Sequence, residues 1–70
     1  MTRGHVMTTE RATLIVGEWL GAPVTNLMLE ATSSDRAGAW AVTAQAAGRR
    51  GRWLILRHED QYHVYPVPTR

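Results

Sequence analysis

The sequence of 70 residues contains no cysteine and no lysine. Without cysteine, disulfide scaffolds, thiolate zinc sites and cysteine nucleophiles are excluded. No apolar run approaches the roughly 20 residues of a membrane span, and the first residues, MTRGHVM, lack the apolar core of a secretion signal. We therefore expect a cytoplasmic protein with no membrane association.

The charge of the chain is also small, at a formal +2, and all eight basic residues are arginine. Arginine carries a planar fork of donors that suits phosphate and carboxylate, although a GC-rich genome explains the same usage equally well. The apolar fraction of 44% is typical of a globular chain. The length permits one small domain, which we place at residues 9–68, after a flexible tail over residues 1–8.

The first periodic segment covers residues 9–20. Its apolar residues have the i, i+3, i+4, i+7, i+8 spacing of one helix face: Ala12, Ile15, Val16, Trp19 and Leu20. Thr8 or Thr9 can cap the start, and Gly21 with Pro23 ends the segment. The pattern predicts a helix with Trp19 in the core.

The next segment, residues 24–32, fits two structures. As a helix over residues 25–31, it places its apolar side chains on one face: Val24, Leu27, Met28 and Ala31. As a strand over residues 26–32, it alternates apolar and polar side chains. We prefer the short helix and keep the strand as the alternative.

Start and stop signals predict a third helix of about 13 residues. Ser33 or Ser34 can cap it, Asp35 suits its first turn, and Gly48 follows its last apolar position. The expected buried stripe is mainly alanine: Ala37, Trp40, Ala41, Ala44 and Ala47. Trp40 and Trp19 against alanine would give the large-against-small packing that a minimal core requires.

The C-terminal residues 52–67 contain two runs rich in β-branched and aromatic residues, RWLILRH and QYHVYPV, which predict a β-hairpin. Because Glu59-Asp60 is not a favoured two-residue turn, we prefer a three-residue loop at residues 59–61. In that register one face carries Leu54, Leu56, Tyr62 and Val64. The other carries Trp53, Ile55, Arg57, His63 and Tyr65.

The order of helix, short helix, helix and two-stranded hairpin resembles a winged helix-turn-helix domain. APVT resembles the entry of the first motif helix, SDRAGAWAVTAQAAG the recognition helix and GRWLILRHEDQYHVYPV the wing. The resemblance covers residues 9–67 and implies an α+β, winged-helix-like fold that binds DNA. The alternative architecture is one N-terminal helix packed on a four-stranded antiparallel meander.

Six residues are the candidate nucleic-acid contacts: Arg36, Thr43, Arg49, Arg50, Arg52 and Arg57. The arginines would position the domain on phosphates, and the threonine hydroxyl would add a neutral contact. The leading expectation is therefore a small DNA-binding, regulatory module. The alternative explanation is a solvated polar turn, which the net charge of only +2 slightly favours.

A second candidate surface is aromatic and apolar, and comprises Trp53, Ile55, His63 and Tyr65. In the preferred register these side chains would form an exposed patch, which usually marks a partner or dimer interface. This patch predicts an alternative function as a protein-binding inhibitor or adaptor, such as a phage or mobile element encodes. The competing explanation is a different register, in which these side chains complete the core.

Chemistry beyond binding has little support in the sequence. His58 and His63 flank a turn that contains Glu59 and Asp60, but zinc requires three or four ligands in a closed arrangement. The six acidic residues are scattered, and no Gly-rich phosphate loop is present. We therefore expect no enzyme activity, no metal, no cofactor and no small-molecule substrate.

Overall fold

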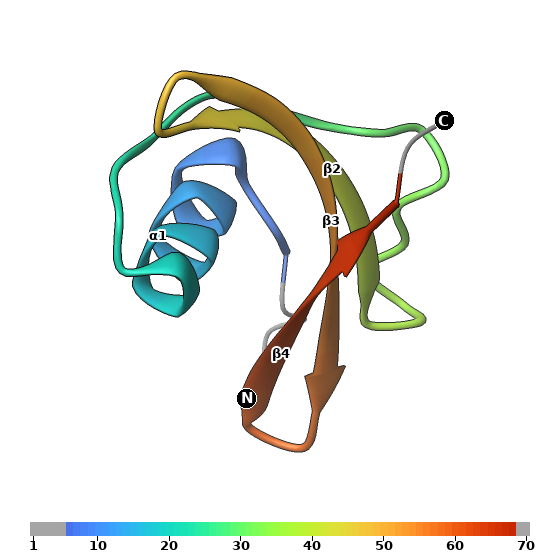
Figure 1. Cartoon of the computed structure of the whole chain (residues 1–70). Helices are drawn as coiled ribbons and strands as arrows, with labels where there is room; N and C mark the ends of the chain where they lie inside the picture. Colours follow the sequence, from blue (N-terminus) through green and yellow to red (C-terminus); the bar gives the residue numbers. More distant parts are fainter. Residues whose placement is uncertain (1–5, 69–70) are drawn as a thin grey trace.

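The computed structural model describes residues 6–68, which form one helix followed by four strands (Figure 1). The elements are α1 (Thr9–Leu20), β1 (Val24–Leu29), β2 (Ala39–Ala46), β3 (Arg49–His58) and β4 (Gln61–Val67). The strands form a single antiparallel sheet in the order β1-β2-β3-β4. In Figure 1 the long strands β2 and β3 bend around α1, which lies on the concave side of the sheet. No helix in this described part is long and apolar enough to cross a membrane.

The predicted fold of three helices and a two-stranded hairpin is therefore wrong. The alternative, one helix packed on a four-stranded antiparallel meander, is the observed architecture. We call the sheet face that carries α1 the inner face and the opposite one the outer face. Of the expected N-terminal tail, residues 1–5 lie outside the described part of the chain, whereas Met7 is buried.

The first helix is confirmed at residues 9–20. The Thr8 side chain accepts a hydrogen bond of 3.1 Å from the Arg11 N–H, which caps the helix start. Gly21 ends the helix in the left-handed region, with a φ of 69°. Ala12 and Val16 are fully buried, but Trp19 is 50% exposed, so its assignment to the core is wrong. Its position on α1 turns it toward β4 and the border of the sheet.

Residues 24–29 form a strand, so the preferred short helix is wrong. The helix-like spacing arises from a β-bulge between Thr25 and Met28, within which Asn26 has a φ of 54°. The bulge inserts one extra residue into β1 and shifts its alternation. As a result Val24 and Leu27, three positions apart, are both buried, as they would be on one face of a helix.

The predicted third helix is also wrong, because residues 39–46 form β2. The buried side chains of this strand recur at every second position: Trp40, Val42 and Ala44. Alanine favours helix locally, but pairing with β3 along the whole strand overrides that preference. The expected capping serine serves the preceding loop instead, since the Ser34 hydroxyl oxygen accepts from the Ala37 N–H at 3.1 Å.

Both hairpin turns contain two residues. Ala47 and Gly48 have φ values of 54° and 77°, as a type I′ turn requires. In the second turn Glu59 has a φ of 59°, and His58 pairs with Gln61. The expected three-residue loop is therefore wrong, and the assignment of β3 residues to the two faces changes with it.

The core lies between α1 and the inner face of the sheet. Its largest fully buried side chains are Trp40, Ile55, Val16 and Val42, and Trp53 and Val64 extend it. The assignment of Trp40 to the core is confirmed, with 1% of the residue exposed. The ring of Trp53 lies over Gly51, where an added Cβ would approach a ring carbon to 2.8 Å. Glycine at this position leaves room for the indole.

Candidate functional site

The outer face of the sheet has an apolar centre that α1 does not cover. By the alternation of the strands and their register, six side chains make up this centre: Met28, Ala41, Leu54, Leu56, Tyr65 and Val67. Met28 is 61% exposed and Tyr65 is 49% exposed, while Leu54 and Leu56 are half-buried by their neighbours. We refer to these six residues as the outer apolar centre.

Strand β3 is apolar on both faces of the sheet. Trp53 and Ile55 point to the inner face and are buried, whereas Leu54 and Leu56 point to the outer face. An antiparallel sheet with one solvated face normally carries polar residues on that face. An apolar stretch on both sides is typical of a strand that is covered on both sides. The outer apolar centre is therefore a candidate interface.

An ion pair crosses β2 within this apolar centre, between Met28 on one side and Ala41 and Leu54 on the other. The Arg52 Nε and Nη2 atoms each donate to the Glu30 carboxylate at 2.9 Å, one to each oxygen. This bidentate geometry is the stronger form of an arginine–carboxylate contact. The hydrogen bond and the charge of Glu30 raise the pKa of the Arg52 guanidinium above its ordinary value. Arg52 is thus engaged within the domain, and a phosphate could bind it only by displacing Glu30.

The other candidate arginines do not gather at one place. Arg49 and Arg50 are exposed beside the β2–β3 turn. Arg57 is near the opposite end of β3, where its side chain lies over Gly38. Arg50 and Arg57 are seven positions apart on β3, about 23 Å along the strand at 3.3 Å per residue. Arg36 is exposed in the loop between β1 and β2. The expected arginine cluster is therefore split between the two ends of the β2–β3 hairpin.

The remaining predicted site residues divide between core and surface. Trp53 and Ile55 are buried on the inner face, so their place on an exposed patch is wrong. Tyr65 and His63 lie on the outer face, as does the half-buried Thr43. The rings of His63 and His58 have centroids 6.4 Å apart. Residues 6–68 contain no group of three or more potential metal ligands.

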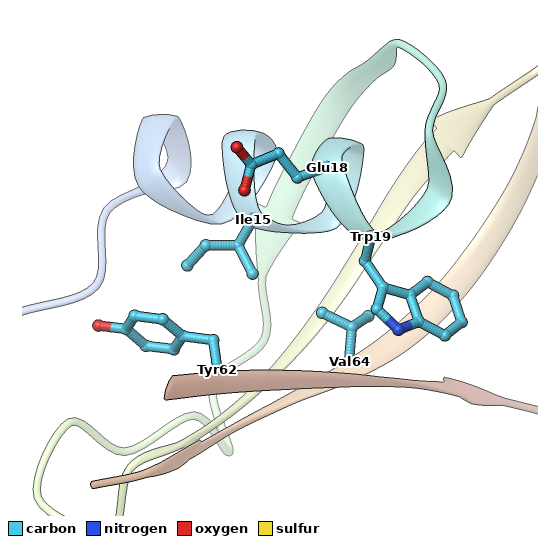
Figure 2. A pocket seen from close by; sticks show the side chains of 5 residues that line it. All are labelled: Ile15, Glu18, Trp19, Tyr62 and Val64. Atoms are coloured by element: carbon cyan, nitrogen blue, oxygen red, sulfur yellow. The ribbon is translucent and has the colours of Figure 1, made fainter. Parts of the chain in front are cut away.

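A groove lies between α1 and β4, at the border of the sheet (Figure 2). It has a volume of about 330 Å³ and is lined by Ile15, Glu18 and Trp19 from α1 and by Tyr62 and Val64 from β4. Figure 2 shows the side chains of Ile15 and Trp19 directed from the helix toward β4. The Glu18 side chain lies along the helix and contributes the groove's charged group.

Asp35 fastens the loop before β2 to the core. Its Oδ1 atom accepts a hydrogen bond of 2.7 Å from the Trp40 indole N–H and one of 3.1 Å from the Met7 backbone N–H. The indole hydrogen bond, followed by that of Met7, lowers the pKa of the Asp35 carboxyl below its ordinary value of 3.8. Asp35 therefore has a structural task and is separate from both surfaces described above.

The search for relatives adds no functional information, since neither family models, curated proteins nor solved structures match this chain. Sequence reasoning named only Tyr65 of the outer apolar centre and missed its other five members. For Leu54 and Leu56 the signal that could have revealed them is the WLIL run, since a strand apolar at four successive positions must place two large side chains on each face.

Proposed function

We propose that this protein is a small binding module that docks on another protein through the outer apolar centre. The observation that carries the proposal is strand β3, which is apolar on both faces while α1 covers only one of them. Large apolar side chains gathered on an uncovered face of a small domain usually mark a docking surface. The absence of cysteine is compatible with a reducing cytoplasm, where we expect the protein to act.

The charges around the centre indicate what kind of surface it meets. Arg50 carries a positive charge on the outer face, and Glu30 is already paired with Arg52. Two copies packed face to face would offer Arg50 no acidic partner from the strands of this face, because Glu30 is already paired with Arg52. A partner with an apolar contact area and acidic residues at its rim would instead complement this face. We therefore propose a different protein, and not a second copy, as the partner.

Nucleic acid binding has less support than protein binding. Phosphate contacts work together when several basic groups line one path along a strand. Here Arg49 and Arg50 are about 23 Å from Arg57 along β3, and Arg52 is held by Glu30. Two separated basic groups on a chain of net charge +2 would give only weak, salt-sensitive binding.

The test compares two charge-introducing variants of exposed residues. Tyr65→Glu disrupts the outer apolar centre, whereas Leu14→Glu changes a 70% exposed position on α1. Proteins that the wild-type chain retains from a cell extract are purified. The affinity of each is then measured for the wild type and for both variants. We expect an acidic partner whose affinity falls about 30-fold or more with Tyr65→Glu, as for a central aromatic residue of an interface, and changes little with Leu14→Glu. Circular dichroism confirms that both variants are folded.

Three outcomes would overturn this proposal. A purified partner that binds Tyr65→Glu as tightly as the wild type uses another surface. A concentration-dependent dimer in light scattering that Tyr65→Glu dissociates would assign the outer face to a second copy. Duplex binding that falls steeply between about 50 and 200 mM salt, and that Arg49→Ala with Arg50→Ala abolishes, would assign the protein to nucleic acid.

A further inference from the structure

Within the described residues 6–68, strand β4 is an open edge of the sheet. It pairs with β3 on one side only, because the strand order ends with β4. The residues that flank a two-residue turn, His58 and Gln61, form a hydrogen-bonded pair, and such pairs then alternate along the ladder. The backbone N–H and C=O groups of Tyr62 and Val64 therefore point away from β3. The same alternation predicts that Ala41 faces β1, and its carbonyl accepts from the Glu30 N–H at 2.8 Å.

The outward backbone groups lie beside the groove between α1 and β4. Tyr62 and Val64 supply them, and the same two residues form the strand side of the groove. The helix side is formed by Ile15 and by Trp19, which remains 50% exposed beside β4 (Figure 2). A row of unpaired backbone groups next to an apolar groove is the arrangement in which an extended peptide can add to a sheet while its alternate side chains enter the groove.

The opposite edge of the sheet lacks this arrangement. Strand β1 has six residues and is interrupted by the bulge around Asn26, which breaks the row of backbone groups. Strand β4 has seven residues in continuous register with β3, and its proline at position 66 removes one outward N–H near its end. Bulges and prolines both protect edges against unwanted pairing. The edge at Tyr62 and Val64 has neither.

We infer that the groove between α1 and β4 binds an extended peptide segment of a partner protein by strand addition. The segment pairs with the backbone of Tyr62 and Val64 and places apolar side chains against Ile15 and Trp19. Glu18 lines the same groove and favours a lysine or arginine in the segment. A second copy of this chain would bring two Glu18 carboxylates into one interface, so charge favours a basic segment over self-pairing. The inference is independent of the outer apolar centre.

The probe is a peptide selected by phage display: a random seven-residue library is screened for binding to the full chain. Its binding can be followed by iodide quenching of Trp19, because Trp40 and Trp53 are buried. We expect selected peptides that alternate apolar residues and contain a basic one, and we expect them to protect Trp19 from iodide. Recovery of no peptide that protects Trp19 would overturn the inference.

Strand addition itself is tested with methylated peptides. N-methylation at every second residue removes the donors on one edge of the bound strand, and shifting the methyl groups by one residue removes those on the other edge. We expect the peptide whose methyl groups face β4 to bind about tenfold or more weakly, since two or more hydrogen bonds are lost. The peptide methylated at the other alternate residues should bind as tightly as the unmodified one. Equal affinity of the two methylated peptides would show that only side chains bind and would overturn strand addition.

The charge preference is tested with Glu18→Lys and a control, Glu10→Lys, at another exposed position of α1. We expect Glu18→Lys to weaken the basic peptide about two- to fivefold and to favour a peptide with glutamate at that position. Glu10→Lys should leave both affinities unchanged. If Glu18→Lys has no effect, the basic partner class is wrong. If Tyr65→Glu abolishes peptide binding in a folded protein, the groove is not an independent site.

Discussion

The two faces of the sheet use the same strands and similar residues but have different surroundings. On β3, Trp53 and Ile55 lie against α1, whereas Leu54 and Leu56, the alternating neighbours, face away from it. The inner face holds the two buried indoles, and the outer face holds smaller side chains together with an ion pair. Apolar composition therefore does not decide which face becomes the core. Side-chain volume and the position of the single helix decide it.

Removing the largest inner-face side chain should have the largest effect on stability. Trp40→Ala is expected to lower the free energy of unfolding by about 3 to 5 kcal/mol, which is enough to unfold a domain of this size. The reason is the cavity that the fully buried indole would leave. Thermal unfolding followed by circular dichroism measures the change. A loss below ~1 kcal/mol would contradict the core assignment.

Adding a methyl group to the inner face should have the next largest effect. Gly51→Ala places a Cβ 2.8 Å from the ring of Trp53, and an indole ring is too rigid to yield without moving. We expect a loss of about 1 to 3 kcal/mol in chemical denaturation. The same substitution in a Trp53→Leu background is the control. If the loss persists there undiminished, the clash with the ring is not its cause.

The hydrogen bonds that Asp35 accepts at one end of the inner face should make the stability of the domain depend on pH in acid. The pKa of Asp35 is lowered in the folded protein, so its carboxylate contributes stability above the ordinary value of 3.8, and this contribution is lost as the pH falls through the lowered pKa. Asn at this position retains an acceptor but has no charge. We expect the melting temperature of Asp35→Asn to fall less than that of the wild type between about pH 5 and pH 2. Parallel acid profiles would refute this.

A substitution in the turn between β2 and β3 should give a small gain in stability. Ala47 has a φ of 54° in the type I′ turn, a conformation that costs alanine energy and suits asparagine before glycine. Ala47→Asn should therefore stabilise the domain by about 0.5 to 1 kcal/mol. Denaturant midpoints measure the gain. Ala37→Asn, at an exposed loop position, is the control and should give no comparable gain.

A substitution on the outer face should change the stability of the isolated domain least. Tyr65→Ala removes an aromatic side chain that is already 49% exposed, and we expect a change within about 0.5 kcal/mol. Set beside Trp40→Ala, this measurement directly compares the two faces. A loss for Tyr65→Ala that approaches that of Trp40→Ala would mean that the outer face is part of the core, for example in a dimer.

The helix over residues 9–20 was predictable because its capping residues and its periodicity agree. The C-terminal hairpin was predictable from its two runs of β-branched and aromatic residues, and it is present as β3 and β4. The two strands between them were not predicted, because there local signals favour a different structure from the one that pairing produces. The bulge at Asn26 gives a strand the i, i+3 spacing of a helix. Alanine around Trp40 favours a helix, but β3 is available as a partner along all of β2.

The candidate surfaces were predictable only in part, for the same reason. Which β3 side chains share a face with Tyr62 and Val64 depends on whether the second turn has two or three residues. Glu59 adopts a positive φ that its residue type does not predict, so the two-residue turn was not foreseen. With the two-residue turn, Trp53 and Ile55 share the face of Tyr62 and Val64 and are buried, where a three-residue loop would have placed Leu54 and Leu56. His63 and Tyr65 remained exposed, so this half of the expected patch is found on the outer face.

The meeting of α1 with β4 has a further consequence for how the chain folds. Each strand pairs with the next one along the sequence, so the sheet can form by successive short-range steps. The contact between Trp19 and the β4 side of the groove instead closes a loop of about forty residues, which is entropically the most demanding step. We therefore expect the helix to dock on the finished sheet late in folding. Backbone amides of α1 should then exchange with solvent sooner than those of β2 and β3.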